Sequence, residues 1–343
     1  MSRAHMFSLL FAGLVVTTTA CGGAASSGGP SVELHGAGAS FPAPLYDRWF
    51  KDYVAAHPNV RVDYQSVGSG AGITQFTNKT VDFGASDAAM TDEEIAKVER
   101  GVQLIPMTAG SVVLAYNLPD LAQPLRLSRK AYADIFLGAI TKWNDPAVAA
   151  ANPGVKLPDL AITVVRRADS SGTTFVFTQH LSAISPAWKT GPGTSKSPNW
   201  PAGVGAKGNE GVTSTIQQTP GALGYVEYGY AKLSALKMAT LENKSGTYIE
   251  PTTASGQAAL AGGQLPANLR LFLPDPDGKD AYPIVTYTWL LAYRQYDQNA
   301  AAALKDVIRY CLDAGQRVSE EMGYIPLPTS VVAANLTALD EIK

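Results

Sequence analysis

Three β-type runs in this chain each end in a turn of small residues that opens a helical segment. GAGAS (36–40) follows VEL, GSGAG (68–72) follows VDYQSV, and DSSGT (169–173) follows ITVVRRA. Strands that alternate with helices in this way form largely parallel sheets, which restricts the chain to an α/β fold. Each turn also presents unpaired backbone N–H groups and the positive end of a helix dipole, which together attract anions. Serine and glycine at a helix start can equally serve only as caps, so both interpretations stand at this point.

The rest of the chain continues the alternation of strands and helices. The segment 44–54 carries its apolar residues at helical spacing, and Thr91 and Glu94 have the spacing of a capping box. Residues 189–211 are rich in proline and glycine and are expected to form an ordered surface loop inside a domain. The predicted strands are 32–38, 60–68, 81–87, 112–118, 161–168, 224–230 and 283–294.

The N-terminus has the features of a secretory signal. Arg3 precedes an apolar run of about ten residues that starts at Phe7, and small residues then lead to Cys21. The run is well short of the ~20 residues that a membrane-spanning helix needs. A cysteine directly after small residues is typical of bacterial lipoproteins. We therefore expect a signal peptide over 1–20 and a flexible Gly/Ser tether over 21–31 that begins with lipidated Cys21, with cleavage and release as the alternative.

Composition restricts the partners and the number of domains. Without the signal, a little over 300 residues remain, more than one hydrophobic core usually supports, which predicts two domains. A formal net charge of −2, with no basic cluster interleaved with aromatic residues, argues against a nucleic-acid partner. The four histidines and two cysteines are scattered along the chain, so no metal site is expected. Cys311 has helical spacing with apolar neighbours and is predicted to be a buried thiol.

The serines of the three turns do not fit the motifs of catalytic serines or nucleotide-binding loops. Neither Ser69 nor Ser171 has the flanking glycines of the G-x-S-x-G nucleophile elbow, and no turn contains the glycine, lysine and hydroxyl sequence of a P-loop. His180 is the nearest candidate base for Ser171, but it lies nine residues further along a predicted helix. At 1.5 Å per residue that separation is roughly 13 Å. We therefore expect His180 to be a surface or packing histidine.

Seven blocks of the chain, in order, resemble the phosphate-binding lipoproteins of bacterial high-affinity phosphate ABC transporters. The blocks are GAGASFPAPLYDRWF, YQSVGSGAGITQF, TVDFGASDAAM, IFLGAITKWND, VVRRADSSGTTFVFTQHL, GALGYVEYGYAK and YPIVTYTWLL. The resemblance runs from about residue 33 to 330, and VDFGASD together with RRADxSGT is highly specific. It implies a two-lobed periplasmic-binding-protein fold of type II. In that fold each lobe is a mixed, mostly parallel sheet flanked by helices, and the ligand cleft lies between the lobes.

The resemblance also implies where the lobes divide and what the protein does. With chain crossings near 111–117 and 283–291, lobe one comprises 32–112 and 286–343, and lobe two comprises 113–285. Family members hold a desolvated phosphate between the lobes and hand it to a membrane permease without making or breaking a bond. The implied partners are therefore inorganic phosphate, the transmembrane permease subunits, and the membrane through the N-terminal lipid. A monomer with no cofactor and no enzyme activity is expected.

Matching the family's motifs residue by residue gives a candidate site. The residues expected to bind phosphate are Ser40, Phe41, Ser69, Asp87, Arg167, Ser171, Gly172 and Thr173. Arg167 offers a rigid fork of N–H donors that suits two oxygens of one anion. From the residues alone Asp169 can either orient Arg167 or bridge to Arg166 as a surface pair. The resemblance favours the first, which leaves Arg166 with a solvent or fold role. Trp143 is expected in the core.

Asp87 is the unusual member of this set, because a carboxylate in an anion site repels the ligand. The contact makes sense if the ligand carries a proton. Phosphate, with a second pKa of about 6 to 7, can donate a proton to Asp87 while accepting from the other groups. Sulfate has no proton to give and would leave a buried carboxylate unpaired, at a cost of several kcal/mol. On its own, Asp87 could equally cap the segment that follows it or form a salt bridge within lobe one.

Two alternative functions stay open from the sequence. One is a receptor for another tetrahedral oxyanion such as sulfate or molybdate, which would use the same donors. The other is a secreted phosphatase or serine hydrolase that uses Ser171 or Ser69 as its nucleophile, against which the missing base argues.

Overall fold

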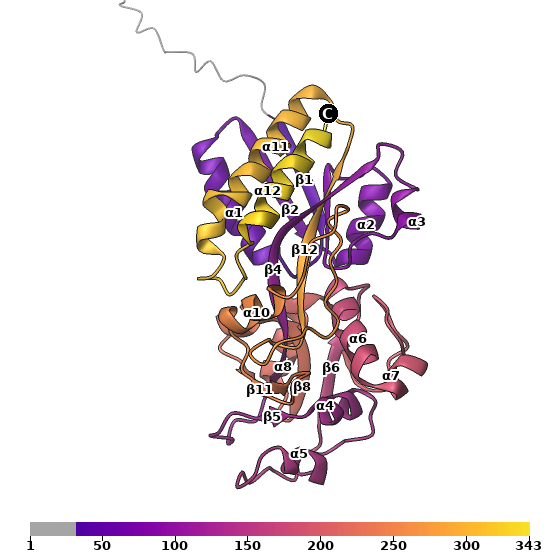
Figure 1. The fold of residues 1–343 in the computed structure, drawn as a ribbon, viewed down its shortest axis with the longest axis vertical. Helices are drawn as coiled ribbons and strands as arrows, with labels where there is room; N and C mark the ends of the chain where they lie inside the picture. The colour runs from indigo at the N-terminus through magenta and orange to yellow at the C-terminus, as the bar shows by residue number, and fades with distance from the viewer. Residues whose placement is uncertain (1–31) are drawn as a thin grey trace, which may run out of the picture.

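Residues 32–343 are described by a computed structural model of the chain (Figure 1). The predicted signal peptide, Cys21 and the tether lie outside these residues. The described part forms two lobes stacked along its long axis, and within it nine strands make one sheet that runs through both lobes. Strand order along this sheet is β2-β1-β3-β12-β4-β8-β6-β7, with β9 beside β4. None of the helices in this range has the length and apolarity to cross a membrane.

The lobe that holds the N-terminal strand is a mixed sheet with helices on both sides. Its strands are β1 (Val32–Gly38), β2 (Val60–Ser66), β3 (Phe83–Ser86), β12 (Val285–Tyr293) and the first part of β4 (Val102–Tyr116). β1 pairs in parallel with β2 and β3, whereas β12 runs antiparallel to β3 and β4. Every residue of β12 is buried, including the two threonines Thr286 and Thr288 in its first half.

The other lobe is built on the second part of β4. Its strands are β6 (Thr163–Arg167), β7 (Val204–Ala206), β8 (Ala222–Glu227) and β9 (Lys237–Met238), with a separate small sheet of β5 (Arg126–Leu127), β10 (Thr240–Glu242) and β11 (Tyr248–Ile249). β6 pairs in parallel with both β7 and β8. β8 in turn pairs antiparallel with β4.

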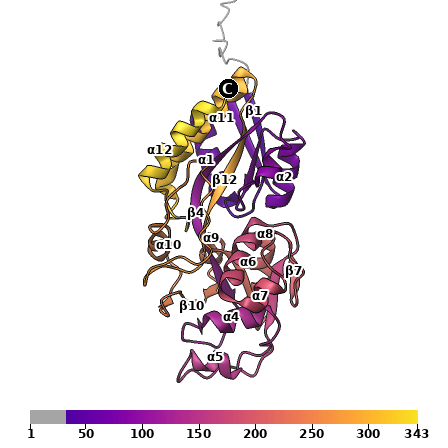
Figure 2. The ribbon, with the colours of Figure 1, turned by 45° about the vertical axis from the view of Figure 1, so that its right-hand side comes forward.

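Helices cover both faces of the sheet in each lobe. Figures 1 and 2 place α1, α11 and α12 on one side of the upper sheet and α2 on the other, and α6, α7 and α8 around the lower one. The helices are α1 (Ala43–Ala56), α2 (Ser69–Thr77), α3 (Asp92–Ile95), α4 (Arg129–Phe136), α5 (Pro146–Ala150), α6 (Gly172–Ile184), α7 (Pro186–Thr190), α8 (Gly208–Gln218), α9 (Tyr228–Leu233), α10 (Thr253–Leu260), α11 (Gln298–Leu312) and α12 (Thr329–Ala338), with 3₁₀ turns at Ala314–Val318 and Leu339–Glu341.

Strand β4 is the element that connects the two lobes. Its residues from Val102 to Ser111 pair with β12, and those from Val112 to Tyr116 pair with β8. The exchange of partners falls within the crossing expected at 111–117. The lobe boundaries 32–112, 113–285 and 286–343 remain a prediction.

The expected strands are all present, with differences at their ends. β4 begins at Val102, ten residues before the predicted run, because QLIPMTAG is also buried against β12. The predicted run 224–230 is a strand only as far as Glu227, whose carboxylate then accepts hydrogen bonds from the N–H groups of Gly229 and Tyr230 and opens α9. The predicted loop 189–211 contains the short strand β7 and the start of α8.

Several local predictions are confirmed by packing and capping. Thr91 and Glu94 form the capping box at the start of α3. Trp143 and Cys311 are fully buried, as expected for core residues. Of the three turn serines, only Ser171 caps a helix with its side chain, accepting from the N–H of Thr174 at 3.0 Å. For Ser40 and Ser69 the capping interpretation does not hold, and both hydroxyls accept hydrogen bonds from the opposite lobe instead.

Candidate functional site

The turns that follow β1, β2 and β3 meet the N-terminal ends of α6 and α8 across the boundary between the lobes. Ser69 Oγ accepts a hydrogen bond from the backbone N–H of Gly172 at 3.0 Å. Asp87 Oδ2 accepts one from Thr173 Oγ1 at 3.3 Å, and Ser40 Oγ accepts one from the N–H of Asn209 at 3.0 Å. The fold therefore brings together segments that are up to 169 residues apart in the chain.

All eight residues predicted to bind an anion lie at this junction and are buried. They are Ser40, Phe41, Ser69, Asp87, Arg167, Ser171, Gly172 and Thr173. Parallel β1, β2 and β3 end at the same edge of the upper sheet, and β6 ends at the facing edge of the lower one, so their turns converge. The backbone carbonyl of Phe41 accepts from the hydroxyl of Tyr324 at 2.8 Å, which fixes this turn from the C-terminal side.

Arg167 is a buried cation that Asp169 holds by two hydrogen bonds. Arg167 Nε donates to Asp169 Oδ1 at 2.8 Å, and Nη2 donates to Oδ2. Burial tends to raise the pKa of Asp169, but the hydrogen bonds and charge of Arg167 outweigh it and lower this pKa. Asp169 also accepts from the N–H of Gly208 at 3.1 Å. The Nε–Nη2 edge of the guanidinium is thus engaged by Asp169, and the edge formed by Nη1 and Nη2 is the one that can serve an anion.

Asp87 is a carboxyl group inside the same junction, with 1% of its surface exposed. Its Oδ1 accepts from Thr288 Oγ1 at 2.9 Å, and its Oδ2 accepts from Thr173 Oγ1. Burial raises the pKa of Asp87 from 3.8 to about 7, although the hydrogen bond from Thr288 and the charge of Arg167 act in the opposite direction. Near neutrality Asp87 therefore exchanges between a proton acceptor and a neutral acid.

The raised pKa of Asp87 predicts how stability depends on pH. Between about pH 4 and pH 7 the folded protein keeps a proton that the unfolded chain has lost, so the free energy of unfolding falls as the pH rises through this window. The full effect is about 4 kcal/mol, at about 1.4 kcal/mol per pKa unit. Asp87→Asn removes the titration. The free energies of unfolding of both proteins are measured by urea denaturation without phosphate. The value for Asp87→Asn minus that for the unaltered protein should rise by about 4 kcal/mol from pH 4 to pH 8. A difference that does not change with pH would contradict this.

The N-terminus of α6 needs glycine at its first position. A Cβ on Gly172 would lie 2.5 Å from Ser69 Oγ and 2.7 Å from the backbone nitrogen of Asp87. With glycine there, the first turn can approach the other lobe directly, and the N–H of Gly172 donates to Ser69 Oγ. Ser171 closes the turn by capping α6, so the N-terminal end of this helix is fixed where the two lobes meet.

Two polar residues at the junction escaped the sequence prediction. Asn209 is completely buried near the start of α8, and its side chain donates to Ser40 Oγ at 3.0 Å and to Thr173 Oγ1 at 3.3 Å. The sequence around Asn209 does contain the relevant pattern, because KGNEG is a further turn of small residues at a helix start. It was overlooked because the surrounding stretch was predicted to be a surface loop. Thr288 stands in the VTYTW half of β12, where the sequence does not show that the threonine faces a carboxyl group rather than solvent or core.

His180 and Arg166 lie outside this set, as expected from the sequence. His180 is buried, and its two ring nitrogens contact the hydroxyl of Tyr132 and the carbonyl of Pro274, both at 2.7 Å. Burial lowers the pKa of His180 to about 4, so it is a neutral packing histidine near pH 7. Arg166 donates only to the carbonyl of Arg167 at 3.3 Å among the described residues.

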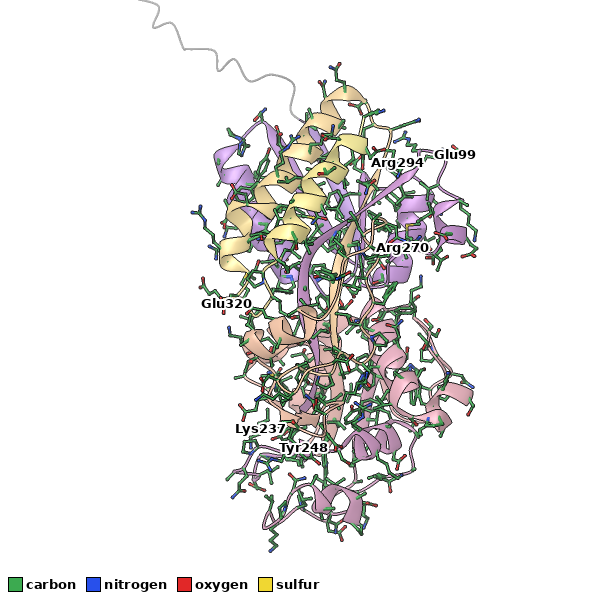
Figure 3. All side chains as sticks on the ribbon, viewed as in Figure 1. Glu99, Lys237, Tyr248, Arg270, Arg294 and Glu320 are labelled. Carbon is green, nitrogen blue, oxygen red and sulfur yellow. The ribbon has the colours of Figure 1, made fainter. Side chains whose placement is uncertain are left out.

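Charged and main-chain contacts join the lobes around the buried site. Lys196 Nζ contacts Glu94 Oε1 at 2.6 Å, and Gly70 donates its N–H to the carbonyl of Ser170 at 2.9 Å. Arg270 lies near the boundary between the lobes in Figure 3 and donates to the carbonyl of Met90 at 3.0 Å. These contacts enclose the junction from outside.

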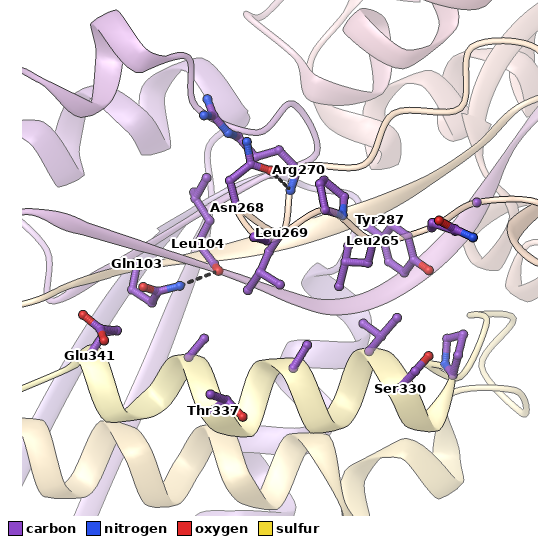
Figure 4. Close-up of a pocket in the computed structure, with 18 of the residues that line it drawn as sticks. Gln103, Leu104, Leu265, Asn268, Leu269, Arg270, Tyr287, Ser330, Thr337 and Glu341 are labelled. Atoms are coloured by element: carbon purple, nitrogen blue, oxygen red, sulfur yellow. Dashed lines mark hydrogen bonds between the residues drawn. The ribbon is translucent and has the colours of Figure 1, made fainter.

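A pocket of about 1030 Å³ lies away from these residues, between α12 and the segment 263–270 (Figure 4). Its lining includes Leu104, Leu269 and Tyr287, and it contains none of the eight predicted anion-binding residues. Among residues 32–343, no three His, Cys, Asp or Glu side chains gather in a way that could hold a metal ion. The buried junction, rather than this pocket, is therefore the candidate site.

Comparisons with known proteins agree with this architecture. Residues 23–314 match the family model described as a PBP superfamily domain. A phosphate-binding protein PstS of Xylella fastidiosa is 41% identical over 306 residues, which cover 88% of this chain and 83% of the relative. A phosphate-binding protein PstS of Pasteurella multocida is 39% identical over 334 residues, covering 96% of this chain and 93% of the relative.

A solved structure supports the fold independently. The phosphate-binding protein of Stenotrophomonas maltophilia superposes with a TM-score of 0.72 at 22% identity, over 90% of this chain and 94% of the other. The two-lobed architecture expected from the seven sequence blocks is therefore confirmed. The chain belongs to the PBP superfamily and, within it, to the family of the PstS phosphate-binding proteins.

Proposed function

We propose that this protein captures inorganic phosphate, as hydrogen phosphate, between its lobes and delivers it to the permease of an ABC transporter. The observation that carries the proposal is that a buried cation and a buried carboxyl group face one enclosed junction, Arg167 from one lobe and Asp87 from the other. An anion that accepts hydrogen bonds on most sides and donates one matches this pair. The relatives that share most of this chain's length are phosphate-binding proteins.

The donors at the junction are sufficient for tight binding. Arg167 supplies charge-assisted hydrogen bonds, which contribute roughly 1.5–3 kcal/mol each, and the first turn of α6 supplies backbone N–H groups. Four or five such bonds, after the cost of association, support micromolar to nanomolar affinity, or about −8 to −12 kcal/mol. Ser40, Phe41 and Ser69 are the donors proposed from the upper lobe, and Ser171, Gly172 and Thr173 those from the lower lobe.

Asp87 is proposed to select phosphate over sulfate or molybdate. A carboxylate buried to this extent is costly unless a proton or a cation satisfies it. Hydrogen phosphate brings that proton, whereas a fully ionised oxyanion brings a second negative charge. The pKa of about 7 for Asp87 lies close to the second pKa of phosphate, so carboxyl group and ligand can share one proton near neutrality.

A phosphatase or serine hydrolase is the less favoured function. A serine nucleophile needs a base that takes its proton. The known hydrogen bonds of Ser69 Oγ come from the backbone N–H groups of Gly172 and Asp87, and His180 is engaged by Tyr132 and Pro274. These contacts favour capture of an intact anion.

Retention and turnover distinguish the two functions. Incubation with radiolabelled phosphate and gel filtration should retain about one phosphate per protein, whereas a phosphoester such as p-nitrophenyl phosphate should release no alcohol above background. Catalytic release of alcohol, or failure to retain phosphate, would show that the proposal is wrong.

We also propose that the protein works outside the cytoplasm, anchored by lipid at Cys21 to the outer face of the cell membrane. The support is the apolar signal of limited length, the cysteine after small residues and the Gly/Ser tether over 21–31. Mass spectrometry of the mature N-terminus should find a diacylglycerol-modified cysteine as its first residue. An unmodified first residue would indicate cleavage and release.

A further inference from the structure

We propose that Asn209 is a positioning residue that makes the hydroxyls of Ser40 and Thr173 act only as hydrogen-bond donors, that of Ser40 toward the ligand and that of Thr173 toward Asp87. The inference rests on the proposed capture of hydrogen phosphate and extends it to a residue that touches both lobes. Asn209 stands near the N-terminus of α8 in the lower lobe, and Ser40 follows β1 in the upper lobe. Asn209 therefore acts where the lobes meet.

The orientation of the Asn209 amide follows from its backbone partner. Asn209 Oδ1 accepts from the backbone N–H of Glu227 at 3.0 Å, and a backbone N–H can only donate. The Nδ2 group must therefore point the other way. It lies 3.0 Å from Ser40 Oγ and 3.3 Å from Thr173 Oγ1, so its two N–H groups are directed at the two hydroxyls.

These hydrogen bonds fix Ser40 Oγ as an acceptor from Asn209. Its Oγ accepts from both the backbone N–H and the side-chain Nδ2 of Asn209, each at 3.0 Å. A hydroxyl has two lone pairs and one proton. Both lone pairs are engaged, so the proton is left to donate to a third group.

Thr173 also accepts two hydrogen bonds, but its proton is donated to Asp87. Its Oγ1 accepts from Nη1 of Arg167 at 3.4 Å and from Nδ2 of Asn209 at 3.3 Å, and it donates to Asp87 Oδ2. Ser69 repeats the pattern without Asn209, because its Oγ accepts from the N–H groups of Gly172 and Asp87. All three hydroxyls thus have their accepting capacity used by protein donors.

The consequence concerns the proton on the ligand. A P–OH group cannot donate to Ser40, Ser69 or Thr173, because each already accepts two hydrogen bonds. Asp87 is the charged acceptor that faces the same junction, so the proton of hydrogen phosphate is directed to Asp87 rather than to these three hydroxyls. Asn209 would in this way contribute to selectivity by acting through Ser40 and Thr173.

A double-mutant cycle tests the coupling between Asn209 and Ser40. Phosphate affinity is measured by calorimetry at pH 7 for the unaltered protein, Asn209→Ala, Ser40→Ala and the double variant. We expect each single change to weaken binding about 10- to 100-fold, and the effect of Asn209→Ala to be at least about threefold smaller when Ser40 is already alanine, with the remaining effect acting through Thr173. Ser40→Thr, which keeps the hydroxyl, is the matched control and should bind within about threefold of the unaltered protein.

Full additivity of the two changes would overturn the proposal, because a residue that only supports the fold has the same effect with or without the Ser40 hydroxyl. If Asn209→Ala does not fold, Asn209→Ser replaces it, since serine is uncharged and keeps a polar oxygen but lacks the amide N–H groups that reach Ser40 and Thr173. The same coupling with Ser40 is then expected. Failure of the unaltered protein to bind phosphate would refute the proposed function itself, a result distinct from additivity in the cycle.

Discussion

Arg167→Ala is expected to weaken phosphate binding about 1,000-fold or more. The guanidinium is 2% exposed and faces Thr173 and Asp87, so an anion in the junction meets it without intervening water. Two or more charge-assisted hydrogen bonds are lost, at roughly 1.5–3 kcal/mol each. Loss of this cation also raises the pKa of Asp87 further, so the carboxyl group is more often protonated and less able to accept the proton of the ligand.

Arg166→Ala is the matched control for this prediction, because it removes the same side chain from the neighbouring position. Arg166 makes no side-chain contact with the eight predicted residues beyond the carbonyl of Arg167. The affinity of Arg166→Ala for phosphate, measured by calorimetry, should stay within about twofold of that of the unaltered protein. Equal losses for the two variants would mean that only the overall positive charge of this strand end matters.

Asp87→Asn is expected to lower the ratio of phosphate affinity to sulfate affinity about 100-fold. In the unaltered protein sulfate meets a buried carboxylate with no proton between them, whereas an asparagine amide can donate to a sulfate oxygen. Phosphate loses the acceptor for its proton and should bind more weakly. Both affinities are measured by competition against labelled phosphate at pH 7.

Asp169→Asn is the control that removes a different carboxylate from the same junction. Asp169 contacts Arg167 and the N–H of Gly208, so its loss should weaken both anions through a less well-held guanidinium. The ratio of phosphate affinity to sulfate affinity should then stay within about threefold of its value in the unaltered protein. A phosphate-to-sulfate ratio that is unchanged in Asp87→Asn would show that Asp87 is not the group that discriminates.

Much of this architecture could be predicted from the sequence because the turns carry their own physical chemistry. Strand ends followed by glycine, serine and a helix predicted both the parallel sheets and the places where backbone N–H groups collect. The order of the seven blocks then predicted the two-lobed fold, and the eight candidate residues do lie together at one buried junction. Their roles in binding phosphate remain predictions.

The residues that were missed have reasons that lie in tertiary structure. Asn209 follows a proline- and glycine-rich stretch, and only the pairing of β7 with β6 brings it to the junction. Thr288 donates to Asp87 from β12, a strand in which every residue is buried. This contact exists only because β12 pairs with β3, which the sequence does not show. The sequence could not decide between capping and the other interpretation for Ser40 and Ser69, because it shows the helix start but not the donors that the opposite lobe supplies.

Competition between phosphate and sulfate for the unaltered protein tests the central claim most directly. Phosphate-free protein is titrated with labelled phosphate at pH 7, first alone and then with a thousandfold excess of sulfate. We predict saturation at one phosphate per chain, with micromolar or tighter affinity, and displacement of less than half of the phosphate by sulfate. Binding of sulfate with an affinity equal to that of phosphate, or no saturable phosphate binding, would contradict a site in which Asp87 requires a protonated anion.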